Sequence, residues 1–153
     1  MLFRSLAVVG PEAPLAAGIA DRFRKKGVPV FGPTAEAARI ESSKAFAKDL
    51  MAEAGIPTAA HRTFTELEPA LAFVRERGAP IVVKASGLAA GKGAVVCPTL
   101  EEAEATVTSM LQDRVFGEAG REVVVEEGEE YGAPLLPVPA LLPLAVLLPA
   151  LVG

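Results

Sequence analysis

Apolar runs and amphipathic stretches alternate along the first 130 residues of the chain. Leu6–Gly10 and Val28–Phe31 are short apolar runs followed by proline-containing turns, so each predicts a buried strand. Between them, Leu15–Lys26 has apolar residues at helical spacing, a basic end and a glycine stop, and it predicts one continuous amphipathic helix. A strand, a helix and a strand in this order indicate a βαβ unit built on a parallel sheet.

Two more helices are expected before the chain reaches Gly55. Thr34 is expected to cap a short helix that runs to Ile40, and Ser42 or Ser43 to begin a second one that runs to Ala54. The second helix is expected to pack through three apolar residues, Phe46, Leu50 and Met51.

Strands and helices alternate again in the rest of this region. Strands are predicted over His61–Phe64, Ile81–Ala85, Ala94–Cys97 and Glu122–Glu126. Helices are predicted over Glu66–Arg77, capped by Thr65 and packed by Leu67, Leu71 and Val74, and from Leu100 to about Gln112, capped by Thr99. The glutamates at the start of the last helix complement its dipole and are not interpreted as a metal site.

Composition places these elements in an α/β globular protein. The chain has 153 residues, 51% of them hydrophobic, and a net charge of −4, which argues against nucleic acid as a partner. The single cysteine, Cys97, excludes an internal disulfide and a cysteine zinc site, and it is expected to be packed. Because the first residues do not resemble a signal peptide, we expect a soluble cytoplasmic protein with no membrane partner.

The end of the chain differs from the rest. From Ala133 to Gly153 no residue is charged, and five prolines interrupt an apolar string of nearly transmembrane length. Our hypothesis is a frameshift near Glu127–Tyr131, so that residues 131–153 are out of frame; a genuine membrane-binding or partner-binding tail is the alternative. Residues 1–5 are also expected to be artificial, because they read like a translated sequencing adaptor.

A glycine-rich segment, Lys84–Gly93, carries the candidate chemistry. Its glycines let backbone N–H groups turn toward an anion, and Lys84 and Lys92 add charges suited to phosphate oxygens. It is not a P-loop, because neither Ser nor Thr follows Lys92 and a strand comes next in place of a helix. We interpret it as a hairpin loop that folds over a triphosphate; an ordinary turn with two solvated lysines is the alternative. Lys84 supports the first interpretation, because it interrupts an apolar strand and needs an anionic partner there.

Five segments occur in a specific order along the chain: Val9–Leu15, Phe31–Thr34, Glu41–Asp49, Gly55–Ala59 and Ala79–Gly93. In sequence and spacing they resemble the ATP-grasp superfamily and, within it, the phosphoribosylamine–glycine ligases. The resemblance covers about residues 6–130. It implies the end of a parallel-sheet pre-ATP-grasp domain over residues 6–40 and the first, small lobe of an ATP-grasp domain over residues 41–130, truncated before the second lobe.

The resemblance also implies an activity for the parent protein. This family joins 5-phosphoribosylamine to glycine while ATP is split to ADP and phosphate in purine synthesis, and Mg²⁺ or Mn²⁺ neutralises the triphosphate. Because the second lobe and its metal ligands would lie outside this chain, the chain alone is expected to be an inactive fragment with no catalytic or metal-binding residue. Another ATP-grasp carboxylate–amine ligase and a non-catalytic nucleotide-binding or interaction module are the alternatives.

Residue by residue, the resemblance implies a nucleotide site built from a helix lysine, a strand lysine, the glycine loop and an acidic segment. These positions are Lys44, Lys84, Gly87, Gly91, Lys92, Gly93, Glu126 and Glu127. Glu12 is a weaker candidate, on the phosphoribosylamine side. Lys48, one turn after Lys44, is expected on the surface, and His61 is expected to be structural or exposed.

Overall fold

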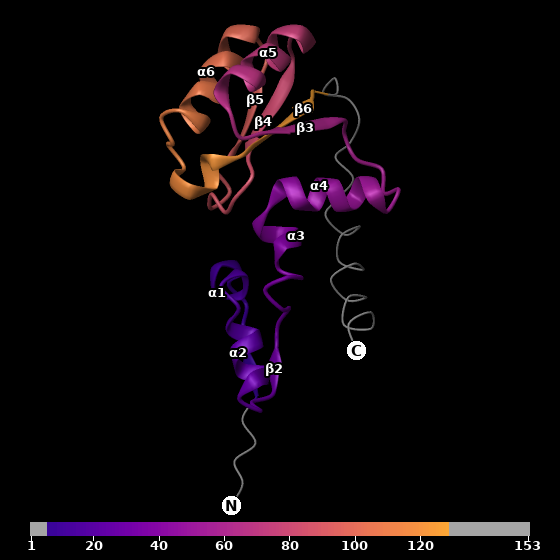
Figure 1. Cartoon of the computed structure of the whole chain (residues 1–153), viewed down its shortest axis with the longest axis vertical. Helices are drawn as coiled ribbons and strands as arrows, with labels where there is room; N and C mark the ends of the chain where they lie inside the picture. Colours follow the sequence, from indigo (N-terminus) through magenta and orange to yellow (C-terminus); the bar gives the residue numbers. More distant parts are fainter. Residues whose placement is uncertain (1–5, 129–153) are drawn as a thin grey trace, which may run out of the picture. The chain divides into compact units, whose positions relative to one another are not determined.

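The computed structural model of the chain describes residues 6–128, and its two compact units divide between Arg39 and Ile40. Residues 6–39 are called the N-terminal unit below, and residues 40–128 the C-terminal unit (Figure 1). The predictions for residues 1–5 and 131–153 lie outside the described residues.

The N-terminal unit is a small parallel βαβ arrangement, as the sequence predicted, but the predicted burial of its strands is wrong, because Val8 and Phe31 are exposed. Strand β1 (Ala7–Val8) pairs in parallel with β2 (Val30–Phe31). The predicted single helix is wrong, because the structure has two, α1 (Glu12–Ala16) and α2 (Ile19–Lys25). Gly18 separates them with a φ of 79°, a left-handed conformation that glycine adopts readily and that ends a regular helix. A small core of Leu15, Ala20 and Ala38 holds the helices against the strands.

The segment after β2 also differs from the prediction. The Thr34 hydroxyl accepts a hydrogen bond from the Ala37 N–H at 3.2 Å, so Thr34 does cap the segment. Residues 35–38 nevertheless form turns, and the helix α3 (Arg39–Ser42) begins only after them. The predicted helix from Thr34 to Ile40 is therefore wrong, since a capping residue fixes where a turn begins but not how far it continues.

The C-terminal unit is built on a four-stranded antiparallel sheet in the order β3-β6-β4-β5. Its strands are β3 (His61–Phe64), β4 (Ile81–Ala85), β5 (Ala94–Cys97) and β6 (Val123–Glu127). The first three match the predicted bounds, and β6 lies one residue later than predicted. β4 and β5 form the predicted hairpin around the glycine-rich loop.

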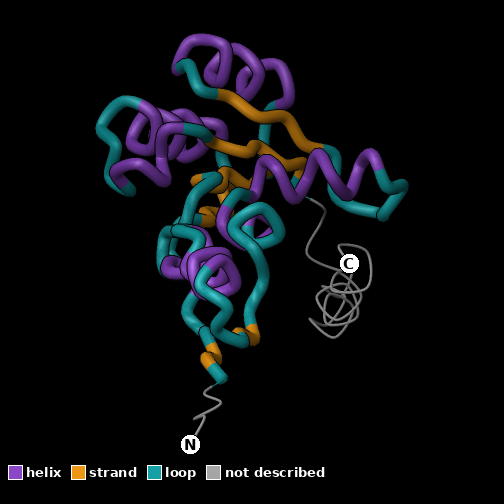
Figure 2. The backbone as a smooth tube through the Cα atoms, turned by 60° about the horizontal axis from the view of Figure 1, so that its bottom comes forward, coloured by secondary structure: helices purple, strands orange, loops and turns teal. Residues whose placement is uncertain are grey.

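Two helices, α5 (Leu67–Arg77) and α6 (Leu100–Leu111), cover one face of this sheet (Figures 1 and 2). The main core lies between them and the strands and includes Leu71, Val74, Val83, Val107 and Met110. Thr99 caps α6, since its hydroxyl accepts from the Glu102 N–H at 3.2 Å. The predicted Thr65 cap of α5 is wrong: Glu66 occupies the N-cap position and makes no side-chain capping bond. A short 3₁₀ helix, η1 (Gly117–Arg121), leads from α6 into β6.

The helix α4 (Lys44–Glu53) packs on β6 and begins at Ser43, one of the two predicted starts. The Ser43 hydroxyl accepts from the Phe46 N–H at 3.2 Å. The predicted packing face is wrong, because the buried residues of α4 are Ala45 and Ala47, whereas Phe46, Leu50 and Met51 are half-buried. Small residues let a helix approach a strand closely. The large apolar residues of α4 therefore did not mark the face that packs on the sheet.

Candidate functional site

Three segments of the C-terminal unit meet at one group of polar side chains: the first turns of α4, the end of β4 and strand β6. Successive side chains of a strand point to opposite faces of the sheet, so only every second residue of β4 and β6 can join this group. In β4, Ile81, Val83 and Ala85 enter the core, so Lys84 points to the opposite face. Glu126 of β6 points the same way, because its neighbour Val125 belongs to the core.

Lys84 and Glu126 form an ion pair across adjacent strands. Lys84 pairs with Val124 in the β4–β6 register and Val82 pairs with Glu126, so the two charged residues are diagonal neighbours. Lys84 Nζ donates to Glu126 Oε2 at 2.8 Å. The sequence argument that Lys84 needs an anion is confirmed, but a carboxylate of the chain itself supplies it. The lysine alone therefore does not establish a phosphate site.

Lys48 also joins this group, and its predicted surface position is wrong. Its side chain is only 12% exposed, with Nζ 3.2 Å from Glu126 Oε2 and 2.6 Å from the Thr58 hydroxyl, to which it donates. The signal for Lys48 was present in the sequence, since residues four apart on a helix share a face and Lys44 was already assigned to the site.

Glu126 is the most buried charged residue of the site, at 5% exposure. Its Oε2 receives both ammonium groups, whereas Oε1 is buried and has no hydrogen-bond partner among the described residues. An unmatched buried acceptor is unfavourable and uncommon in native proteins. It fits a site that a donor group of a ligand completes.

The N-terminus of α4 is not free to bind an anion through its backbone. The Lys44 N–H donates to the Ser86 carbonyl at 2.8 Å, and the Ala45 N–H donates to the Ser86 hydroxyl at 3.2 Å. With the Phe46 N–H held by Ser43, the first three donors of the helix are all occupied. Anion binding here must therefore rely on side-chain ammonium groups and the loop. Ser86, only 3% exposed, was not singled out from the sequence, because its role depends on a helix some forty positions earlier.

Lys44 extends beneath the start of the glycine-rich loop. Its Nζ donates to the carbonyl oxygens of Ala85 at 2.9 Å and Gly87 at 3.2 Å. Burial, and secondly the positive charge of Lys84, lower the pKa of Lys44 below the ordinary lysine value, against an opposing effect of Glu41. Two ammonium groups, those of Lys48 and Lys84, thus contact a single carboxylate, and that of Lys44 lies near Lys84. This excess of positive charge fits a polyanionic ligand.

The loop itself is tight at its base and open at its tip. A Cβ atom on Gly87 would lie 2.6 Å from Cα of Ala119, and one on Gly93 would lie 2.6 Å from Cβ of Ala89. Gly91, at the tip, has a φ of 77°, and apart from its chain neighbours no described residue lies within 4 Å of its Cβ position. Lys92 is exposed next to it. The bases of the loop are therefore fixed by close packing, whereas the tip is accessible.

Glu127, the other predicted acidic residue of the C-terminal unit, does not join this group. The Glu127 carboxylate pairs with the guanidinium of Arg77, the last residue of α5. Glu12 is exposed at the start of α1, in the N-terminal unit. His61 Nε2 lies 3.6 Å from Asp49 Oδ1, and Cys97 is fully buried, as predicted. Within residues 6–128, no group of three or more His, Cys, Asp or Glu residues could hold a metal ion.

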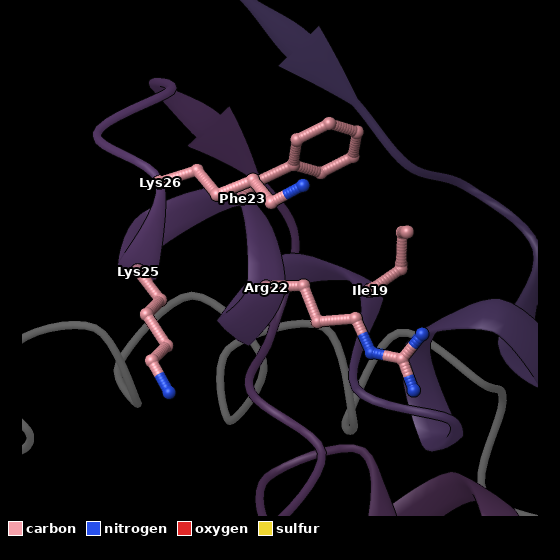
Figure 3. Close-up of a pocket in the computed structure, with 5 residues that line it drawn as sticks. All are labelled: Ile19, Arg22, Phe23, Lys25 and Lys26. Atoms are coloured by element: carbon pink, nitrogen blue, oxygen red, sulfur yellow. The ribbon is translucent and has the colours of Figure 1, made fainter.

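A pocket of about 620 Å³ lies beside α2 and is a poorer candidate. Ile19 and Phe23 form its apolar part, and Arg22, Lys25 and Lys26 its basic part. Figure 3 shows the charged ends of Arg22 and Lys25 pointing in different directions. Basic residues in the last turn of a helix complement its dipole, which accounts for them without a ligand.

Comparison with known families assigns both units. The N domain of phosphoribosylglycinamide synthetase matches residues 4–41, and the ATP-grasp (A) domain of the same synthetase matches residues 42–133. The chain belongs to the phosphoribosylglycinamide synthetase family. Curated relatives named phosphoribosylamine–glycine ligase are 61% identical in Pseudomonas aeruginosa and 60% identical in Escherichia coli K12, over 82% of this chain. The sequences of both units therefore match domains of the same synthetase family.

Solved structures agree with this family assignment. Phosphoribosylamine–glycine ligase from Thermotoga maritima superposes with a TM-score of 0.67 at 27% identity, covering 84% of this chain and 31% of that one. A second solved structure is the biotin carboxylase domain of 2-oxoglutarate carboxylase from Hydrogenobacter thermophilus, in complex with MgADP. It superposes with a TM-score of 0.67 at 23% identity, covering 82% of this chain and 28% of that one. The second likeness concerns the ATP-grasp fold alone.

The chain spans only 30% of the length of the curated synthetase relatives it matches. None of the helices in residues 6–128 is both long and apolar enough to cross a membrane.

Proposed function

We propose that this chain provides the nucleotide-binding small lobe of a phosphoribosylamine–glycine ligase. The whole enzyme would join 5-phosphoribosylamine to glycine and split ATP to ADP and phosphate in the cytoplasm. Residues 6–40 would end the N-terminal domain and residues 41–130 would form the first ATP-grasp lobe. The family match and the identity to curated ligases support this proposal.

The observation that carries the proposal is the excess of positive charge under the glycine-rich loop. Lys48 and Lys84 both contact one carboxylate, Glu126, and the ammonium group of Lys44 lies near that of Lys84, in a half-buried setting where charges are weakly screened. When bound, ATP with Mg²⁺ or Mn²⁺ would supply the phosphoryl group that activates a carboxylate. Lys44 and Lys84 would then bind phosphate oxygens, and the loop from Gly87 through Gly91 and Lys92 to Gly93 would exclude water above them.

Strand β6, which carries Glu126 and Glu127, would contact the base and sugar of the nucleotide. Glu126 Oε1 is buried without a partner and could accept a hydrogen bond from the base or sugar. Glu127, engaged with Arg77, would act mainly through its backbone. Glu12, in the other unit, would face the phosphoribosylamine. Metal ligands are not proposed among residues 6–128.

Titration calorimetry with MgATP tests the binding step. The unaltered chain should bind MgATP with measurable heat, and Lys84→Met should lose at least tenfold in affinity, because one phosphate-binding charge is removed. Lys25→Met, which removes an exposed charge on α2, is the matched control and should bind as the unaltered chain does. Equal affinity in Lys84→Met and the unaltered chain would contradict the assignment of the site.

An activity assay separates the alternatives. With MgATP, glycine and phosphoribosylamine, the chain alone should release no ADP. The first lobe would form only half of the nucleotide site, and the transition state would also need groups of the second ATP-grasp lobe of the whole enzyme. MgATP binding without turnover, in a chain that stays monomeric and stable, would also fit a non-catalytic nucleotide module. Supplying the rest of the synthetase as a second polypeptide distinguishes the two, since only a ligase lobe should restore turnover.

A further inference from the structure

Glu126 is shared by two lysines that come from different elements. Lys84 Nζ of β4 and Lys48 Nζ of α4 both contact Oε2, at 2.8 Å and 3.2 Å. The carboxylate is 5% exposed, so leaving it with no cation would carry a large desolvation penalty. Any state of the site in which one lysine leaves Glu126 therefore depends on the other.

The two lysines are held differently. Lys48 is 12% exposed and also donates to the Thr58 hydroxyl at 2.6 Å, so its ammonium is fixed from two sides. Lys84 is 27% exposed, and within the described part of the chain its ammonium group forms a hydrogen-bonded ion pair with Glu126 alone. Lys84 also lies two residues before Ser86, where the glycine-rich loop begins. Of the pair, Lys84 is the one placed to reach an incoming anion.

We propose that Lys48 is a positioning residue that stays on Glu126 while Lys84 exchanges this carboxylate for a phosphate group. The nature of the anion rests on the function proposed above. The pairing of Lys48 with Glu126 does not, because it is a property of the ligand-free chain. Lys48 keeps the buried carboxylate paired and in position during the exchange, so Lys84 can move without leaving a lone charge behind.

The ligand-free half of the proposal is tested with Lys84→Met, which imitates the departure of Lys84. A crystal structure of Lys84→Met reports the pairing directly, as the distance between Lys48 Nζ and Glu126 Oε2. This distance should stay near the 3.2 Å of the unaltered chain. Separation of the two groups, or a variant that no longer folds, would show that Lys48 does not suffice and would overturn the proposal.

The exchange itself is tested with inorganic tripolyphosphate and with MgATP as probes. Lys48→Met should weaken binding of both by on the order of 100-fold, because Lys84 can then bind phosphate only by leaving Glu126 unpaired. Lys48→Arg, which keeps the charge, should restore most of the affinity. Lys25→Met, on α2 and exposed, should change neither.

A double-substitution cycle separates positioning from simple structural support. In a Glu126→Gln background no buried charge has to be kept paired, so adding Lys48→Met should change affinity by less than about threefold. An equal loss with and without Glu126→Gln would show that Lys48 acts independently of Glu126 and would overturn the proposal. If the unaltered chain binds neither probe, the function proposed above fails, and the distance between Lys48 Nζ and Glu126 Oε2 in Lys84→Met still decides the role of Lys48.

Discussion

The hydroxyl of Ser86 accepts a hydrogen bond from the backbone N–H of Ala45 at 3.2 Å. Ser86 lies at the end of β4, and Ala45 lies in the first turn of α4. A strand end thus supplies part of the cap of a distant helix, next to the Ser43 hydroxyl, 3.4 Å from that of Ser86. The base of the glycine-rich loop and the start of the helix that carries Lys44 are therefore held as one assembly.

Ser86→Ala should lower the free energy of unfolding by about 1 kcal/mol, because the Ala45 N–H loses its acceptor in a buried position. Urea denaturation measures this loss. Ser42→Ala is the matched control and should be nearly neutral, since its hydroxyl makes no hydrogen bond in the described part of the chain. A neutral Ser86→Ala would show that water replaces the hydroxyl.

Lys44 should make the stability of the chain depend on alkaline pH. Its pKa is lowered in the folded state, first by burial and then by Lys84, so the unfolded chain binds more protons between this pKa and the ordinary value of 10.5. The free energy of unfolding contributed by this group therefore rises as pH increases through that window. Urea titrations at several alkaline pH values should show this rise, and Lys44→Met should reduce it. The same slope in both proteins would contradict the shift.

The two ends of the glycine-rich loop should respond differently to an added methyl group. Gly87→Ala places Cβ 2.6 Å from Cα of Ala119, so the loop must separate from η1, at a cost of about 1–3 kcal/mol. Gly91→Ala meets no atom within 4 Å apart from its chain neighbours and should lose about 1 kcal/mol for its left-handed backbone alone. Amide NMR shifts distinguish them, because only Gly87→Ala should perturb η1. Matching perturbations would show that the loop base is not packed as described.

Met110→Ala tests the core beneath the site. Met110 is 1% exposed between α6 and the sheet, so its truncation should cost about 2–5 kcal/mol in urea denaturation. Leu100→Ala removes a large apolar side chain at an exposed position of the same helix and serves as the control, with a much smaller loss expected. Similar losses for both variants would contradict the described burial of α6.

Most of the secondary structure follows from local pattern. The alternation in Ile81–Ala85 and the capping residues Ser43 and Thr99 depend on neighbours within a few positions, and the structure confirms them. The errors occur where local signals compete. Gly18 ends a helix that the apolar spacing continued, and α4 packs through Ala45 and Ala47 because close approach to the sheet favours small side chains.

The sequence by itself determined the strands of the hairpin, the glycine-rich loop between them and the presence of lysines suited to an anion. Only the tertiary structure decided how those lysines are partnered. Lys84 and Glu126 are 42 residues apart and meet because β6 enters the sheet between β3 and β4. Lys48 reaches the same carboxylate because α4 packs on β6. Pairing over such separations depends on how strands and helices assemble, which local periodicity does not encode.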